Sequence, residues 1–100
     1  EDGQWLDELS DERFRTLAVE TEAGLELDAR RLVETPPPIL RRVLLRAMRA
    51  LAGTREVGLD HVEAVAALLS GTQGGVDVPG SRVELRGGKL VLLEQRGGRR

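Results

Sequence analysis

Four arginines within one short segment are the strongest candidates for chemistry in this 100-residue chain. They are Arg41, Arg42, Arg46 and Arg49. The last three follow the i, i+4, i+7 spacing that places side chains on one face of a helix, and the stretch 35–53 contains no acid. Guanidinium groups match phosphate oxygens in pairs, so the stripe predicts a contact with a phosphate backbone. The alternative, which spacing alone favours, is a solvated face whose arginines pair with the acidic N-terminal helix.

A glycine pair near the C-terminus is the second candidate. The segment Gln73-Gly74-Gly75-Val76-Asp77 resembles part of the SGGxDS loop with which PP-loop ATPases hold pyrophosphate. That loop needs a following helix whose N-terminal amides point at the phosphates, but here a Val-Pro-Gly turn follows. Gln73 also replaces the opening serine of the motif, and Val78 replaces its closing Ser or Thr. We therefore interpret the segment as a turn that enters a strand.

The single histidine, His61, lies in the first turn of a predicted helix, near the positive end of the helix dipole. No Ser, Cys or Asp is placed by the sequence to make it catalytic. Two interpretations remain, a surface histidine, which we favour, and a contact with a bound anion beside the helix amides. The chain has no cysteine, which excludes disulfides and thiolate metal sites. We expect no catalytic residue, metal ligand or cofactor-binding residue in this chain.

Hydrophobic periodicity predicts the helices that must position these residues. A helix is expected over about residues 4–23, and Asp28 is placed to cap a short helix that runs through Val33. The prolines 36–38 suit a polyproline ligand, but proline also suits the first turn of a helix, and we favour a helix over 38–52. Its apolar residues share one side, namely Leu40, Val43, Leu44, Ala47, Met48 and Leu51.

A further helix is expected from residue 59 to Gly71, packed antiparallel to the helix over 38–52. Asp60 is predicted to be its N-cap, with Glu63 completing a capping box.

After Gly71 the apolar residues alternate with polar ones, which predicts three short strands, the last two forming a hairpin. Turns are expected at 79–81 and 87–89. The strand edges offer backbone groups that can bind a peptide or a nucleic acid, although short hairpins usually just cover a core. The expected fold is mostly α with a small C-terminal β-hairpin or three short strands, an α+β helical accessory domain. We expect a connecting helix over 1–23, the accessory domain over 24–94 and a flexible tail over 95–100.

The charges are unevenly distributed. The net charge is −2, and residues 1–34 carry eleven acids and four arginines, in contrast to the purely basic stretch 35–53. This pattern favours one local anion-binding surface over general coating of nucleic acid. No apolar run approaches the roughly 20 residues of a membrane span. Because the chain begins with Glu1 instead of Met, we interpret it as a fragment of a longer protein.

The order of these pieces resembles one family, the bacterial tRNA(Ile)-lysidine synthetases. The resembling segments are LDARRLVETPPPILRRVLLRAMRALAG, LDHVEAVAALLSG and GGVDVPGSRVELRGGKLVLL. In that family a proline leads into a basic, leucine-rich helix, a helix of the type HVEAVLAL follows, and a strand region with a VDLPGG turn comes next. The likeness covers about residues 25–93, and it rests on the succession of the pieces with matching spacers.

The resemblance implies a function in tRNA modification. Members of the family use ATP to adenylate the wobble cytidine of an isoleucine tRNA, and lysine then attacks to give lysidine. That chemistry belongs to an N-terminal PP-loop ATPase domain, whose SGGxDS motif is absent here, so ATP and Mg are expected to bind the parent enzyme and not this chain. The expected partners are isoleucine tRNA with a CAU anticodon and the PP-loop domain of the same protein, in the cytoplasm and without a membrane.

Through the resemblance we assign tRNA contacts to the four arginines and His61. Arg41, Arg42 and Arg46 fall on the basic helix pattern of the family, and His61 falls on its HVEAV pattern. The rival hypothesis is a protein-docking module in which the stripe of Leu40, Leu44, Met48 and Leu51 meets a partner. Salt distinguishes the two, because phosphate contacts weaken steeply with salt and an apolar interface hardly does.

Overall fold

The computed structural model describes the backbone of residues 2–71 and 74–95, and the side chains of this range from Glu8 onward. The helices are α1 (Asp2–Leu17), α2 (Ala29–Val33), α3 (Pro37–Ala52) and α4 (Leu59–Leu69). The strands are β1 (Ala18–Thr21), β2 (Gly24–Asp28), β3 (Gly74–Val78), β4 (Ser81–Arg86) and β5 (Lys89–Glu94). The domain is therefore α+β, as expected. The tail over 96–100 and Gln73 lie outside the described residues.

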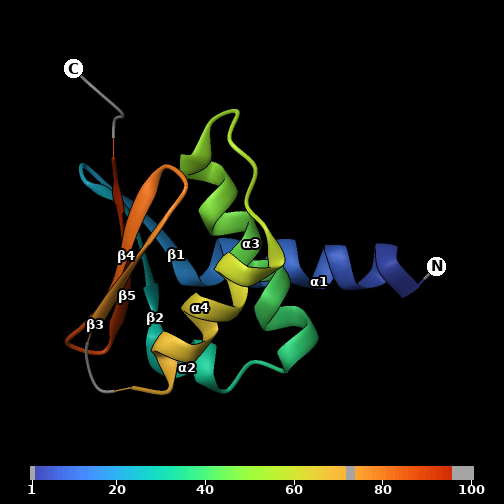
Figure 1. Ribbon diagram of the computed structural model, residues 1–100. Helices are drawn as coiled ribbons and strands as arrows, with labels where there is room; N and C mark the ends of the chain where they lie inside the picture. Colours follow the sequence, from blue (N-terminus) through green and yellow to red (C-terminus); the bar gives the residue numbers. More distant parts are fainter. Residues whose placement is uncertain (1, 72–73, 96–100) are drawn as a thin grey trace.

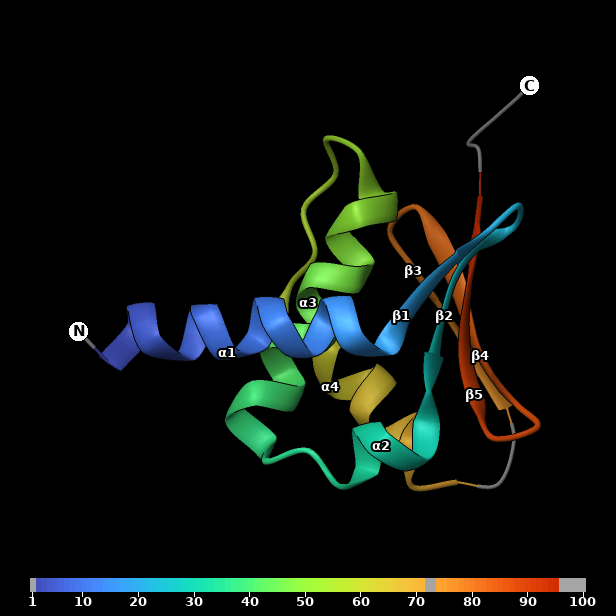
Figure 2. The ribbon, with the colours of Figure 1, turned by 180° about the vertical axis from the view of Figure 1, so that it is seen from behind.

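The molecule has two layers (Figures 1 and 2). The helices α1, α3 and α4 lie on one side of a five-stranded antiparallel sheet, and no helix within the described residues covers its other face. The strand order is β1-β2-β5-β4-β3, so the last strand in the sequence lies at the centre beside a strand from the N-terminal part. The three strands predicted after Gly71 are confirmed, and β4 and β5 form the predicted hairpin.

The N-terminal hairpin β1–β2 is the main departure from the sequence prediction. The helix expected over 4–23 ends at Leu17, and residues 18–21 form β1 instead. β2 pairs with β5, and Leu25 lies opposite Leu92 while Leu27 lies opposite Leu90. Short two-stranded hairpins are marginal alone, so this pairing with a distant strand decides the structure of 18–28, which local helical spacing does not reveal.

The core is aliphatic and lies between the sheet and the helices. Leu44 and Met48 of α3 are each 1% exposed, and they pack with residues from the inner face of the sheet. The fully buried side chains of the sheet in this cluster are Leu27, Val83, Leu90 and Leu92. Burying these side chains is the main stabilising contribution, at about 1.5–3 kcal/mol for each large aliphatic residue.

The helix termini confirm the predicted cap at Asp28 and the predicted place of the prolines at the start of a helix. The Oδ1 atom of Asp28 accepts hydrogen bonds from the backbone N–H groups of Arg30 and Arg31 at 3.0 and 3.3 Å. The prolines begin α3, with Pro36 as the N-cap, and Gly53 ends the helix with a φ of 66°. Helix α4 begins at Leu59 as expected, but the capping box predicted from Asp60 and Glu63 is wrong, because the N-cap is Gly58 and the residue three positions after it is His61.

Helices α3 and α4 pack against each other, and the chain reverses its direction between them (Figure 1). Within residues 2–71 and 74–95, no helix is both long enough and apolar enough to cross a membrane.

Candidate nucleic-acid interface

A groove between α1 and α3 brings three of the predicted arginines together. Its volume is about 640 Å³, and we call it the arginine groove. The residues that line it are Ser10, Asp11, Phe14, Arg42, Leu45, Arg46, Arg49 and Ala50. Val43 and Ala47 lie on the face of α3 that is buried in the core. The neighbouring face of this helix lies against α1. The prediction that Arg42, Arg46 and Arg49 share one helical face is confirmed.

Arg46 is held at the centre of this groove by two residues of α1. Its Nη1 atom lies 2.8 Å from Oδ1 of Asp11, and its guanidinium lies over the ring of Phe14, 5.1 Å from the ring centroid. The second contact has the geometry of a cation–π interaction. Arg46 therefore pairs with the acidic N-terminal helix, as the alternative interpretation of the arginine stripe expected.

Arg42 and Arg49 line the α3 side of the arginine groove together with Arg46. Arg49 is exposed and has no ion-pair partner among the side chains that the structure describes. It also borders a second hollow of about 440 Å³, which Arg55 helps to line. Arg42 is half-buried in the wall of the arginine groove. The groove thus presents guanidinium groups over about two turns of α3, a spacing suited to an extended anion.

Arg41 does not join these arginines. Its Nε atom lies 2.9 Å from Oε2 of Glu63, so the side chain bridges α3 to α4 outside the arginine groove. Both side chains of this ion pair are about half exposed, at 51% and 49%. Exposed pairs of this kind contribute little to stability, about 0–1 kcal/mol. The structure therefore gives Arg41 a bridging contact between the two helices, separate from the other predicted arginines.

His61 lies at the N-terminus of α4, where its side chain caps the helix. Its Nδ1 atom accepts a hydrogen bond from the backbone N–H of Gly58 at 3.0 Å. The side chain is half-buried and lies outside the arginine groove. Its position three residues after the N-cap is the signal that could have indicated this capping role.

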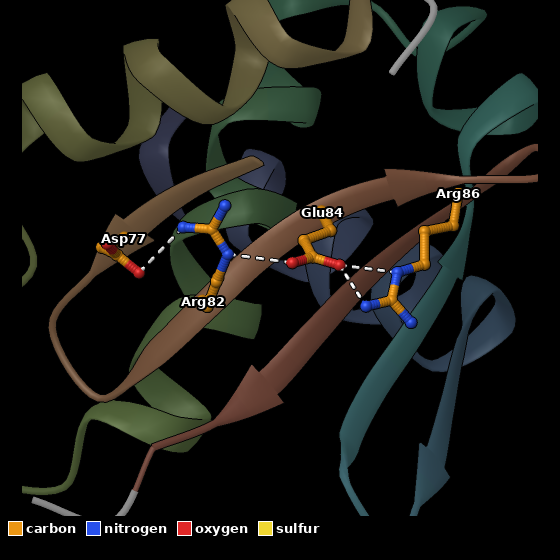
Figure 3. Close-up of polar contacts among 4 residues, drawn as sticks. All are labelled: Asp77, Arg82, Glu84 and Arg86. Carbon is orange, nitrogen blue, oxygen red and sulfur yellow. Dashed lines mark hydrogen bonds and ion pairs between the residues drawn. The ribbon is translucent and has the colours of Figure 1, made fainter. Parts of the chain in front are cut away.

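A network of charges on the open face of the sheet is a feature that our sequence analysis missed (Figure 3). Asp77 of β3 and Arg82, Glu84 and Arg86 of β4 follow one another across this face, and we call them the charge ladder. The Nε atom of Arg82 lies 2.9 Å from Glu84, and its Nη1 atom lies 3.2 Å from Asp77. The Nε atom of Arg86 lies 2.6 Å from Glu84. Charges of alternating sign occupy every second position of β4, and this pattern in the sequence could have indicated the charge ladder.

The charge ladder changes the proton affinity of its own members. Hydrogen bonds from Arg82 and then from Arg86 lower the pKa of Glu84 below its ordinary value. A hydrogen bond to Glu84 and then one to Asp77 raise the pKa of Arg82. The carboxylates thus satisfy two of the arginines on this face, and the ladder offers an incoming anion less than the arginine groove does.

The structure also describes two other segments that the sequence analysis considered, the glycine pair near the C-terminus and the apolar stripe of α3. Gly74–Val78 is the edge strand β3, which agrees with our interpretation of the glycine pair as the entry to a strand. In the apolar stripe of the docking hypothesis, Leu44 and Met48 are buried in the core of the domain itself, and Leu40 and Leu51 are half-buried against it. Within residues 8–71 and 74–95, no group of three His, Asp or Glu side chains is arranged to hold a metal ion.

Comparison with known proteins adds no relative. The sequence matches no protein-family model, and no curated protein matches it.

Proposed function

We propose that this chain is a tRNA-binding accessory domain of a tRNA(Ile)-lysidine synthetase. In this proposal it holds isoleucine tRNA with a CAU anticodon beside a PP-loop ATPase domain of the same protein. That domain uses ATP and Mg to attach lysine to the wobble cytidine. The observation that carries the proposal is the arginine groove, in which Arg42, Arg46 and Arg49 line one wall.

The chemistry of the groove suits the backbone of an RNA. Guanidinium groups donate paired hydrogen bonds to phosphate oxygens, and contacts of this kind fix the position of a nucleic acid without reading its sequence. Phe14 adds an aromatic surface on the opposite wall, next to Arg46. Base recognition is then left to the PP-loop domain, where the modified cytidine must bind.

The charge distribution supports a local contact over a broad one. The whole chain has a net charge of −2, so most of its surface does not attract a polyanion. The part of α3 that faces α1 carries arginines and no acid of its own. An RNA backbone is therefore expected to meet this domain along α3. Arg41 and His61 lie outside the groove, and their contacts with tRNA stay a prediction of the family resemblance.

The test is a titration of fluorescently labelled isoleucine tRNA with the wild-type chain and two charge-reversed variants. Arg49→Glu changes the groove, and Arg30→Glu is the matched control on α2. Both arginines are exposed and neither has an ion-pair partner among the described side chains. We expect Arg49→Glu to weaken binding about tenfold or more, since a hydrogen-bonded charge pair contributes about 1.5–3 kcal/mol. Arg30→Glu is expected to change the affinity less than about twofold.

Equal affinities for wild type and Arg49→Glu would contradict the proposal, as would equal losses in both variants. Far-UV circular dichroism of the three proteins establishes that they are folded to the same extent.

A further inference from the structure

An acid of α1 lies in the arginine groove in direct contact with one of its arginines. Among the described residues that line the groove, Asp11 is the one with a negative charge, and its carboxylate lies 2.8 Å from Arg46. We propose that Asp11 is an internal competitor that occupies Arg46 until an RNA phosphate displaces it. This inference rests on the proposed function and concerns the regulation of that same groove.

The geometry supports displacement of Asp11 by a phosphate. A carboxylate and a phosphodiester both present anionic oxygens to the N–H groups of a guanidinium, so they compete for the same donors. Asp11 comes from α1 and Arg46 from α3, so the contact is between two helices and can open without unwinding either one. Phe14 keeps the guanidinium in place during the exchange, because Arg46 lies over its ring independently of the carboxylate.

The strength of the contact fits a reversible competitor. The side chains of Arg46 and Asp11 are 46% and 42% exposed, and ion pairs with this degree of exposure are weak and screened by salt. An anion that contacts only Arg46 gains one interaction, and this interaction must replace the ion pair between Arg46 and Asp11. An RNA backbone contacts Arg46 and Arg49 together, so it has a second interaction in its favour. Asp11 therefore lowers the affinity of every anion that needs Arg46, and the added contact with Arg49 compensates an extended polyanion for this loss.

The experiment compares Asp11→Asn with Glu12→Gln in the same tRNA titration at low salt. Both changes remove one negative charge from α1, but Glu12 lies outside the arginine groove and lines another hollow beside Ile39. We expect Asp11→Asn to bind tRNA about two- to fivefold more tightly than wild type, as an exposed ion pair would allow. Glu12→Gln is expected to stay within about 1.5-fold of wild type.

A double-mutant cycle then separates competition from a purely structural role. In an Arg46→Gln background, Asp11→Asn should no longer tighten binding, because the competition acts through Arg46. Unfolding in urea provides the second readout, since Asp11→Asn is expected to lower the midpoint slightly while it raises the affinity.

The possible outcomes separate this inference from the proposed function. If Asp11→Asn binds no more tightly than wild type while Arg49→Glu binds less tightly, the internal competitor is refuted and the tRNA-binding groove stands. Equal tightening by Asp11→Asn and Glu12→Gln would also refute it, because the effect would then follow net charge alone. If wild type, Asp11→Asn and Arg49→Glu all fail to bind tRNA, both the inference and the proposed function fall.

Discussion

At the scale of single residues, several charged side chains of this domain have a partner from a different element. Asp11 meets Arg46 across α1 and α3, and Glu63 meets Arg41 across α3 and α4. The sequence indicated that three arginines share one face of a helix, because helical spacing can be read from residues close together in the chain. It offered the acidic N-terminal helix as a partner but did not identify Asp11 or Glu63, since each ion pair depends on how the helices pack. Charge counting therefore indicated the basic face of α3 and left its individual ion pairs undetermined.

The cap on α4 can be tested by changing His61. The imidazole accepts a hydrogen bond from the N–H of Gly58, which the first turn of the helix otherwise leaves without a partner. We expect His61→Ala to lower the free energy of unfolding by about 0.5–1 kcal/mol. His61→Gln should retain most of it, because a glutamine at the same position can accept the same bond. Urea denaturation measures both, and an equal loss in the two variants would show that His61 stabilises α4 by another contact.

The charge ladder predicts a dependence of stability on pH. The pKa of Glu84 is lower in the folded protein than its ordinary value, so the folded state binds fewer protons at this site than the unfolded state does. The stabilisation is then fully present above the ordinary pKa of a glutamate. It is lost as the pH falls through the lower pKa of the folded state.

We therefore expect wild type to be more stable than Glu84→Gln at about pH 7, and the difference to shrink as the pH falls toward about 3. Urea midpoints at several pH values measure this difference. Glu94→Gln, which removes an exposed carboxylate outside the ladder, is the control for net charge. A constant difference between wild type and Glu84→Gln at all pH values would contradict the role of the ladder.

At the scale of secondary-structure elements, α3 is the part that connects stability with function. One side of it is buried in the core, and the adjacent side carries the arginine groove. Its C-terminal end is held by the turn between β3 and β4. A β-carbon on Gly80 would collide with the backbone carbonyl of Leu51, and the φ of Gly80 is 85°. The turn and the end of α3 are therefore packed backbone against backbone.

This contact predicts a large difference between two glycine substitutions. Gly80→Ala should lower the free energy of unfolding by about 2–4 kcal/mol, because a positive φ and a steric clash both oppose the new methyl group. Gly87→Ala is the control, since its φ is 52° but a β-carbon there would lie in open space. We expect it to cost only about 1 kcal/mol. Similar losses in a urea titration of the two variants would show that the turn does not pack against α3 as described.

The sequence predicted the elements after residue 28 well and those before it poorly. The helix over 37–52 and the three C-terminal strands have regular apolar periods and turn residues at their ends, so local information was sufficient. β1 and β2 are only four and five residues long. They become strands because β2 pairs with β5, more than sixty positions later, and no local pattern contains that contact.

At the scale of the whole molecule, the domain divides its charges between two faces. The open face of the sheet carries arginines and acids that neutralise one another in the charge ladder. The described residues that line the arginine groove between α1 and α3 include three arginines and one acid, Asp11. The sequence offered pairing of the basic helix with the acidic N-terminal helix as an alternative, but which side chains meet is a property of the packed fold. The unbalanced face is the one we propose for tRNA.

The most direct test of this account is the salt dependence of tRNA binding. The variant Arg46→Gln/Arg49→Gln removes two groove cations, and Arg15→Gln/Arg30→Gln removes two exposed arginines outside the groove. Each phosphate contact adds about 0.7–0.9 to the slope of log affinity against log salt. The account predicts that the slope of the groove variant is shallower than that of wild type by about 1.5, while the control variant retains the wild-type slope. Three equal slopes would contradict it, because tRNA would then bind without the arginines of α3.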